Sequence, residues 1–144
     1  PKDYVWSTLA DCLPDDGDLE AIDQRLVWIR KAPRALTGDW LKQLLDRHVF
    51  ETPPLILADS GRACFRAMHE GVPAWENNAD AVRGSLEPLQ EIARDTQSAV
   101  LVVHHDNKSN GTSGSSDWEA TPDYVLRYEK RGEARCLSIR GRHN

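Results

Sequence analysis

Two short apolar runs in the chain stop abruptly at polar residues. The first covers residues 55–59 and ends in a carboxylate, and the second covers 99–103 and ends at His104 and His105. A short apolar run that is rich in β-branched residues and bounded by polar ones is typical of a strand buried on both faces of a parallel sheet. The pattern therefore predicts two strands of a mainly parallel sheet.

Helical periodicity is found in two longer segments. Thr37-Gly38-Asp39 can cap a helix whose apolar positions continue to Val49, and a second helix is predicted over residues 79–96. Pro88 lies inside the second helix, where we expect a kink or a break near the first turn. The segment between these elements, 60–78, contains glycines, a proline and paired asparagines, which predict a long surface loop with at most one helical turn.

The remaining segments complete an α/β pattern. Residues 26–29 resemble a strand, after an acidic segment over 1–24 that is expected to form a loop and a short helix. The stretch 107–116 is made almost wholly of small polar residues and should be mobile unless a ligand orders it. Strands over 124–128 and 134–139 would form a hairpin. The predicted fold class is α/β, a mainly parallel sheet flanked by helices with an antiparallel C-terminal edge.

Composition limits the class of protein. With 144 residues, of which 40% are hydrophobic, the chain can form one globular domain. The net charge of −5 argues against a general nucleic-acid-binding surface, and the strongest local basic patch is the C-terminal run between Lys130 and Arg142.

Cysteine usage and hydropathy bear on the compartment. Three widely spaced cysteines, Cys12, Cys64 and Cys136, fit neither a disulfide framework nor a zinc knuckle, so we expect a reducing, cytoplasmic environment. No apolar run approaches the roughly eighteen residues that a membrane span needs, so no membrane association is expected. The chain begins with Pro1 and its only methionine is Met68, which favours a processed N-terminus or a piece of a longer protein.

The polar residues after the two apolar runs are the candidate chemistry. Ligands of open α/β sheets bind outside the carboxyl ends of the strands. Asp59 and Ser60 would lie at one such end, and His104, His105 and Lys108 at the other. A carboxylate, a hydroxyl, histidines and a lysine are suited to magnesium or phosphate chemistry.

The order of motifs along the chain carries a resemblance to a known family. LILADS, ENN, IARDT, AVLVVHHDNKS, GTSGSSDWEATPDYVLRYEK and LSIRGRHN follow one another between residues 26 and 144. In this order they resemble the second half of the RecA-like ATPase core of hexameric replicative helicases of the RepA and DnaB types. The resemblance implies a single partial RecA-like domain over 1–144, with a variable segment over 1–25 and the core over 26–144.

The resemblance assigns nucleotide-binding roles at the strand ends. Asp59 would match the Walker B aspartate that holds Mg²⁺ through water, with Ser60 beside it. His105, together with His104, would match the sensor of the γ-phosphate. His105 is preferred because it is the last residue before the loop. ATP and Mg²⁺ are the implied cofactors.

Further implied roles concern neighbouring molecules. Arg140 and Arg142 would match the basic pair that reaches the nucleotide of the next subunit of a homo-oligomeric ring, with Arg142 as the arginine finger. Lys108, Asn110 and Ser113 lie in the loop that would contact the backbone of single-stranded DNA at the centre of that ring.

The chain also departs from the family pattern. No G-x-x-x-x-G-K-[ST] loop is present in its 144 residues, so it should neither bind ATP in the family manner nor hydrolyse it alone. The segment that holds the family's catalytic glutamate would precede this chain. Ser113 stands where RepA-type proteins have an arginine, and Gln97 where the family has a glycine.

Two other classes of function stay open. The chain could be a binding or assembly module that lacks a P-loop and catalysis. It could instead be a metal-dependent hydrolase that uses Asp59, His104, His105 and Asp106 as zinc or iron ligands, although adjacent histidines on a strand point to opposite faces. Simpler roles exist as well: Asp59 as a turn former, the late arginines as a solvated edge, and the tryptophans as core, with Trp118 beside the polar loop as the exception.

Overall fold

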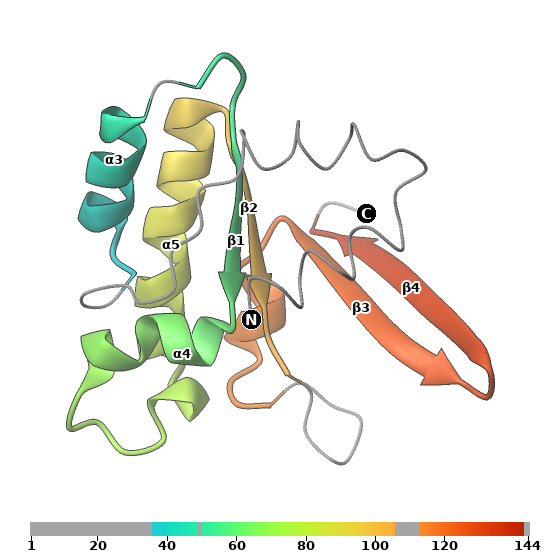
Figure 1. The fold of residues 1–144 in the computed structure, drawn as a ribbon. Helices are drawn as coiled ribbons and strands as arrows, with labels where there is room; N and C mark the ends of the chain where they lie inside the picture. Colours follow the sequence, from blue (N-terminus) through green and yellow to red (C-terminus); the bar gives the residue numbers. More distant parts are fainter. Residues whose placement is uncertain (1–35, 49, 106–112, 143–144) are drawn as a thin grey trace, which may run out of the picture. The chain divides into compact units, whose positions relative to one another are not determined.

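The computed structural model describes residues 36–48, 50–105 and 113–142, all within the compact unit 32–144. The predicted strand over 26–29 and the N-terminal segment lie outside these residues. The elements in chain order are α3 (Gly38–Arg47), β1 (Leu55–Asp59), α4 (Gly61–Phe65), η1 (Arg66–His69), η2 (Trp75–Asn77), α5 (Ala79–Thr96), β2 (Ala99–Val103), α6 (Asp117–Ala120), β3 (Tyr124–Arg131) and β4 (Ala134–Gly141) (Figure 1).

The two apolar runs form a parallel pair, as predicted. β1 and β2 are in register from Leu55 opposite Ala99 to Asp59 opposite Val103. The face that carries Ala58 is packed against the core, whereas Leu57 on the other face is exposed. The expectation of strands buried on both faces is therefore wrong for the described residues, because no described element covers the second face.

Both predicted helices are present. α3 begins at the Thr37 cap, whose hydroxyl accepts a hydrogen bond from the Trp40 amide at 3.2 Å. α5 begins at Asn78, whose side chain accepts from the Ala81 amide at 3.1 Å, and packs against α3 and β2 (Figure 1). Pro88 does not break α5, which runs without interruption to Thr96.

Packing on both sides of Pro88 explains the unbroken helix. Leu86 and Leu89 are both buried, so the apolar face of α5 continues past the proline. A side chain at Gly38 would come within 3.0 Å of Cβ of Pro88, so the start of α3 lies directly against the proline. The packing of this face offsets the hydrogen bond that the proline cannot donate.

Residues 60–78 do not form the predicted surface loop. They form α4 and two 3₁₀ turns, and they contribute Phe65 and Trp75 to the core. These helices are one turn long, too short for an apolar period to be visible in the sequence. The aromatic side chains, rather than a repeating pattern, hold this segment in place.

The C-terminal strands form the predicted hairpin but not the edge of the parallel sheet. β3 and β4 pair antiparallel from Tyr124 opposite Gly141 to Arg131 opposite Ala134, with Gly132 at a φ of 61° in the turn. In the described part of the chain the hairpin is a separate two-stranded sheet. The molecule is thus a mixed α/β protein with one small parallel and one small antiparallel sheet.

The core lies between α5, the inner face of β1 and β2, and the aromatic residues of the short helices. Its buried hydrophobic members are Leu36, Leu41, Ala58, Phe65, Trp75, Val82, Leu86, Leu89, Ile92 and Trp118. None of the helices in the described ranges is long and apolar enough to cross a membrane.

Candidate functional site at the carboxyl ends of β1 and β2

Asp59 and Ser60 lie where β1 turns into α4. Asp59 is exposed at the end of the strand, level with Val103 of β2, and the Asp59–Ser60 peptide bond is cis. The Ser60 carbonyl accepts the hydrogen bond of the Cys64 amide at 2.9 Å, which makes Ser60 the first residue of the helical turn. The turn thus presents a carboxylate and a hydroxyl-bearing residue beside the end of β2.

Gly61 allows this turn to approach the neighbouring strand. A Cβ atom at this position would lie 2.7 Å from Cγ1 of Val102 and 3.2 Å from the Trp118 ring. Any larger residue would push α4 away from β2 and from Trp118. The close approach therefore fixes Asp59 and Ser60 beside the strand that carries the histidines.

Cys64 lies on the inner side of the same turn. Burial raises the pKa of its thiol above the ordinary value of 9.0, and the nearby Asp59 carboxylate adds to the increase. The thiol is therefore protonated at neutral pH and is a poor nucleophile. The chemistry of this edge thus depends on Asp59 and the residues after β2.

The His104 side chain packs against the described part of the molecule, whereas the His105 side chain is exposed. Its ring stacks on Trp118 with the centroids 4.1 Å apart and the planes at 12°. Nε2 of His104 lies 2.6 Å from the Ser113 carbonyl oxygen, and since a carbonyl can only accept, this nitrogen carries the proton. His105 is exposed, and its assignment as the γ-phosphate sensor stays a prediction.

Trp118 joins the histidine to the core. Its ring, 6% exposed, also contacts Phe65 and Trp75, at centroid distances of 6.3 and 6.0 Å. Its indole N–H donates to the Glu76 carbonyl at 3.3 Å. In the sequence, Trp118 was set apart from the other tryptophans because it lies beside the polar loop. In the structure it belongs to the core and holds the end of that loop.

The last residues of the polar loop are anchored. The Ser115 amide donates to the Glu76 carbonyl at 2.7 Å, and Gly114 has a φ of 96°. Ser113, an expected DNA contact, uses its carbonyl for His104 and is half-buried. The other two expected contacts, Lys108 and Asn110, lie outside the described residues.

Glu76 begins the ENN motif, but no role was predicted for this residue from the sequence. Its carbonyl accepts from both Ser115 and Trp118, and its carboxylate forms a 2.8 Å ion pair with Arg62. No spacing in the sequence indicates this contact, since Glu76 and Trp118 are 42 positions apart.

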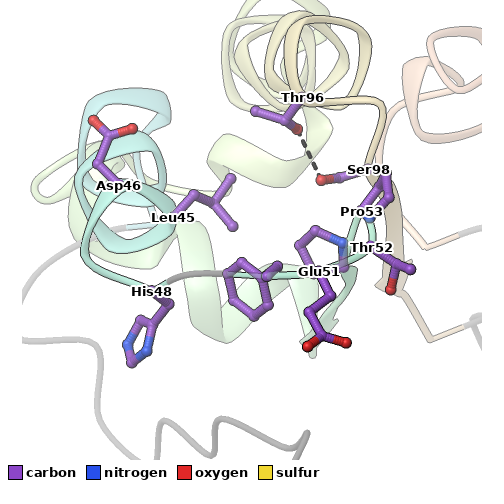
Figure 2. A pocket seen from close by; sticks show the side chains of 10 residues that line it. Leu45, Asp46, His48, Glu51, Thr52, Pro53, Thr96 and Ser98 are labelled. Atoms are coloured by element: carbon purple, nitrogen blue, oxygen red, sulfur yellow. Dashed lines mark hydrogen bonds between the residues drawn. The ribbon is translucent and has the colours of Figure 1, made fainter.

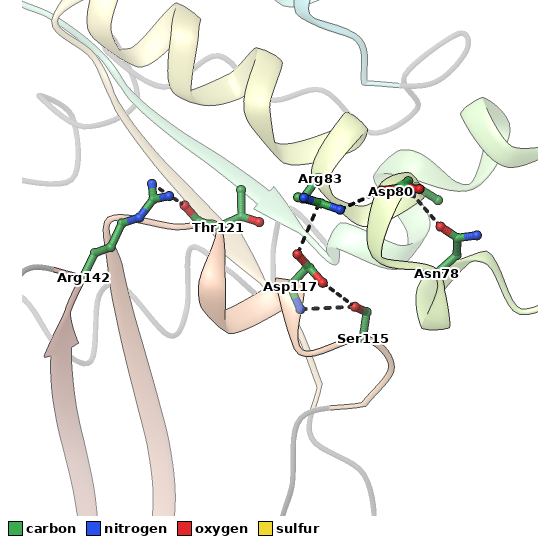
Figure 3. Close-up of polar contacts among 8 residues, drawn as sticks. Asn78, Asp80, Arg83, Ser115, Asp117, Thr121 and Arg142 are labelled. Carbon is green, nitrogen blue, oxygen red and sulfur yellow. Dashed lines mark hydrogen bonds and ion pairs between the residues drawn. The ribbon is translucent and has the colours of Figure 1, made fainter.

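Arg140 and Arg142, the two arginines at the end of the chain, differ in the contacts that they make. Arg140 forms an ion pair with Glu119 at 2.8 Å, and Arg127 contacts the same carboxylate at 2.7 Å. Arg142 is exposed, and its guanidinium donates a long, 3.4 Å hydrogen bond to the Thr121 carbonyl (Figure 3). Within the described ranges no ion pair joins Arg142 to Asp59. Action of Arg142 on another subunit stays a prediction.

A second set of charges ties α6 to α5. Arg83 contacts Asp80 at 2.7 Å and Asp117 at 3.4 Å (Figure 3). Asp117 also accepts a hydrogen bond from the Ser115 hydroxyl at 2.9 Å. The helix that carries Trp118 is thus held by charged contacts on α5 as well as by its aromatic packing.

The hollow in Figure 2 lies at the other end of the sheet. It measures about 310 Å³. Its lining residues are Leu45, Asp46, His48, Phe50, Glu51, Thr52, Pro53, Pro54, Thr96 and Ser98. The hydroxyls of Thr96 and Ser98 are hydrogen-bonded to each other at 2.8 Å. Most of the lining side chains are exposed, and the hollow lies at the amino ends of β1 and β2. Ligands of α/β sheets bind at the opposite end, so this hollow is not the candidate site.

The metal-hydrolase alternative depended on a cluster of ligands. Among the side chains that the structure describes, no group of three or more His, Cys, Asp or Glu could hold a metal ion, and Asp106 lies outside them. His104 instead packs on Trp118 and bonds to Ser113. The observed contacts favour a packing role for this histidine.

Comparisons of the chain with protein-family models, with curated proteins and with solved structures found no match.

Gly114→Ala is expected to lower the free energy of unfolding by about 2–3 kcal/mol. A Cβ atom there would lie 2.3 Å from the Glu76 carbonyl oxygen, and the left-handed φ adds backbone strain. Gly71→Ala is the matched control, because Gly71 has a φ of 81° but open space around its Cα, so only about 1 kcal/mol should be lost. Urea unfolding followed by circular dichroism measures both; equal losses would contradict the close packing of Gly114.

Proposed function

We propose that this chain is the carboxyl-terminal part of the ATPase core of a ring-forming, DNA-acting motor of the RecA-like class. The observation that supports the proposal most directly is the parallel pairing of β1 with β2 in one register. This pairing puts Asp59 opposite Val103, the residue that precedes the two histidines. In a nucleoside triphosphate site, a carboxylate at one strand end holds the metal ion, and a hydrogen-bonding residue at the adjacent strand end contacts the γ-phosphate.

Asp59 fits the role of a magnesium ligand acting through water. It is exposed at the strand end, and in the described part of the chain no cation forms an ion pair with it. Mg²⁺ keeps most of its water shell in nucleotide sites and is held by one or two carboxylates. When bound with ATP it would neutralise phosphate charge, and Asp59 would orient it.

The histidine pair would divide two tasks. His104 is fixed by its stacking on Trp118 and so holds the exit of β2 at a constant position. His105, exposed on the next residue, is free to donate a hydrogen bond to a phosphate oxygen.

Arg142 is the arginine that suits a role in a neighbouring subunit. It is exposed and weakly held, whereas Arg140 is engaged by Glu119. A guanidinium that reaches the next subunit's site would stabilise the charge that develops on the transferred phosphate. Arg140 is better placed to position the hairpin that carries Arg142.

The coding sequence that precedes Pro1 tests the proposal directly. We expect it to encode a strand followed by G-x-x-x-x-G-K-[ST], about one βαβ unit upstream. An upstream sequence that lacks this loop would overturn the motor assignment and favour a binding or assembly module without catalysis.

The isolated chain should not hydrolyse ATP. Without a loop of backbone N–H groups around the phosphates, Asp59 and His105 retain too few contacts to bind the nucleotide productively. Phosphate release at millimolar MgATP should equal that of buffer, for the chain and for Asp59→Ala alike. Turnover that survives Asp59→Ala would contradict the assignment of Asp59.

A further inference from the structure

The β3–β4 hairpin has one strongly apolar face. Side chains alternate along each strand, and five large hydrophobic residues fall on the same side: Tyr124, Leu126, Tyr128, Leu137 and Ile139. We call this set the hairpin face. Its members are 46% to 65% exposed, so none of them is packed against the described part of the molecule.

The opposite face of the hairpin is already occupied. Arg127 of β3 and Arg140 of β4, which are diagonal neighbours on this face, both bind Glu119 of α6. At the base of the hairpin the Arg142 amide donates to the Asp123 carbonyl at 2.8 Å. These contacts direct the hairpin face away from α6. A two-stranded hairpin is marginally stable by itself, so a cover for the apolar face would add stability.

The size of the hairpin face fits a protein partner. Its five side chains expose on the order of 600 Å² of surface, the upper end of the largest patch on a typical monomer. Two such faces packed together would bury about 1,200 Å², the lower limit of a specific protein interface.

We propose that the hairpin face binds the same face of a second copy of this chain, with β3 lying antiparallel over β3 of the partner. The centre of the hairpin face on β4 is Ser138, midway between Leu137 and Ile139, and Ser138 stands opposite Arg127 of β3. A two-fold axis across this point places Leu126 of each copy over Tyr128 of the other. Sheets packed face to face in this way lie about 10 Å apart.

Charge favours the antiparallel orientation. Lys130 and Arg135 are paired across the strands near the turn and lie on the same side as the hairpin face. A parallel arrangement would bring four of these cations together. In the antiparallel arrangement Lys130 and Arg135 of each copy lie over the open end of the partner's hairpin. At that end the exposed Tyr124 ring stands opposite Gly141 and follows Asp123 in the chain. The missing side chain at Gly141 leaves room for a cation over that ring.

Sedimentation equilibrium of the full chain tests the proposal. We expect a monomer–dimer equilibrium with the dimer dominant at about 100 μM, as for a small interface. Leu137→Asp should abolish the dimer because it places a charge in the apolar contact. Ser138→Asp is the matched control: it adds the same charge one residue further on, on the opposite face, and should leave the equilibrium unchanged.

A second variant and a direct contact measurement keep the test independent of folding. Leu126→Ser should weaken the dimer while the near-ultraviolet circular dichroism stays that of the parent chain. In a mixture of labelled and unlabelled chains, isotope-filtered nuclear Overhauser spectra should show Leu126 methyls against the Tyr128 ring of the other copy. A dimer that lacks this contact, or one that Leu137→Asp and Ser138→Asp weaken equally, would overturn the proposal.

Other occupants would give other results. A chain that is monomeric at several hundred micromolar overturns the second copy as the partner. A fluorescein-labelled oligothymidylate tests the alternative that the hairpin face stacks on bases. If it binds the parent chain but not Tyr128→Ser, the hairpin face binds nucleic acid and the dimer proposal is overturned. Because the test requires neither ATP nor a P-loop, its failure is distinguishable from failure of the motor proposal.

Discussion

Trp118→Ala is expected to lower the free energy of unfolding by about 3–5 kcal/mol, the usual loss when a buried large aromatic side chain is truncated. The ring is buried and contacts Phe65, Trp75 and His104 at once. Its removal leaves a cavity, deprives the Glu76 carbonyl of a donor and frees the His104 ring. A domain of this size has only about 5–15 kcal/mol in total, so the variant should be partly unfolded at 37 °C.

Trp118→Phe separates the contributions to this loss. Phenylalanine keeps an aromatic ring in the stack but cannot donate to the Glu76 carbonyl, so we expect about 1–2 kcal/mol to be lost. Urea unfolding monitored by circular dichroism at 222 nm gives both values. A loss below about 1 kcal/mol in Trp118→Ala would show that α6 does not anchor the end of β2.

Arg142→Ala should lower ATP turnover by a factor on the order of 10³ or more in a form of the protein that carries a P-loop ahead of this chain. Nucleotide binding should stay nearly unchanged, because an arginine finger acts on the transition state of the neighbouring site. To reach the next subunit, the exposed guanidinium would release its 3.4 Å hydrogen bond to the Thr121 carbonyl (Figure 3). Steady-state phosphate release and equilibrium binding of a fluorescent nucleotide measure the two effects.

Two controls distinguish action between subunits from a local role of Arg142. Arg131→Ala removes another exposed arginine, at the far end of the hairpin and paired with Glu129, and should leave turnover unchanged. Mixing Arg142→Ala with Asp59→Ala subunits should restore part of the activity, since some interfaces then combine both intact residues. Normal turnover in Arg142→Ala, or mixtures that stay inactive, would contradict the role between subunits.

Elements with a long or unbroken pattern were predictable from the sequence. The bounds of α5 agree with the prediction, since its apolar face repeats over the whole segment from Ala79 to Thr96. The parallel strands were equally evident from two apolar runs that end in polar residues. The carboxyl-end location of the candidate chemistry followed from this pattern and from general properties of α/β sheets.

Features that depend on contacts between distant residues were not predictable. Phe65 and Trp75 turn an irregular segment into core, although nothing near them in the sequence repeats. Which of the two histidine side chains is packed depends on Trp118, which is 14 positions from His104 in the sequence. Its ring stacks on His104, and His105 stays exposed. The attachment of the hairpin to α6 likewise depends on Glu119 binding Arg127 and Arg140, a set of contacts that has no local signature.

The short helix α6 is held in place by ion pairs and by apolar packing, and dissolved salts act on these two interactions in opposite directions. Glu119 and Asp117 hold the hairpin and α5 through partly exposed ion pairs, which mobile ions screen. Trp118, on the same helix, is held by apolar packing, which strongly hydrated salts such as sulfate strengthen. Rising sulfate is therefore expected to weaken the contacts of Glu119 with the hairpin while it strengthens the apolar packing of Trp118.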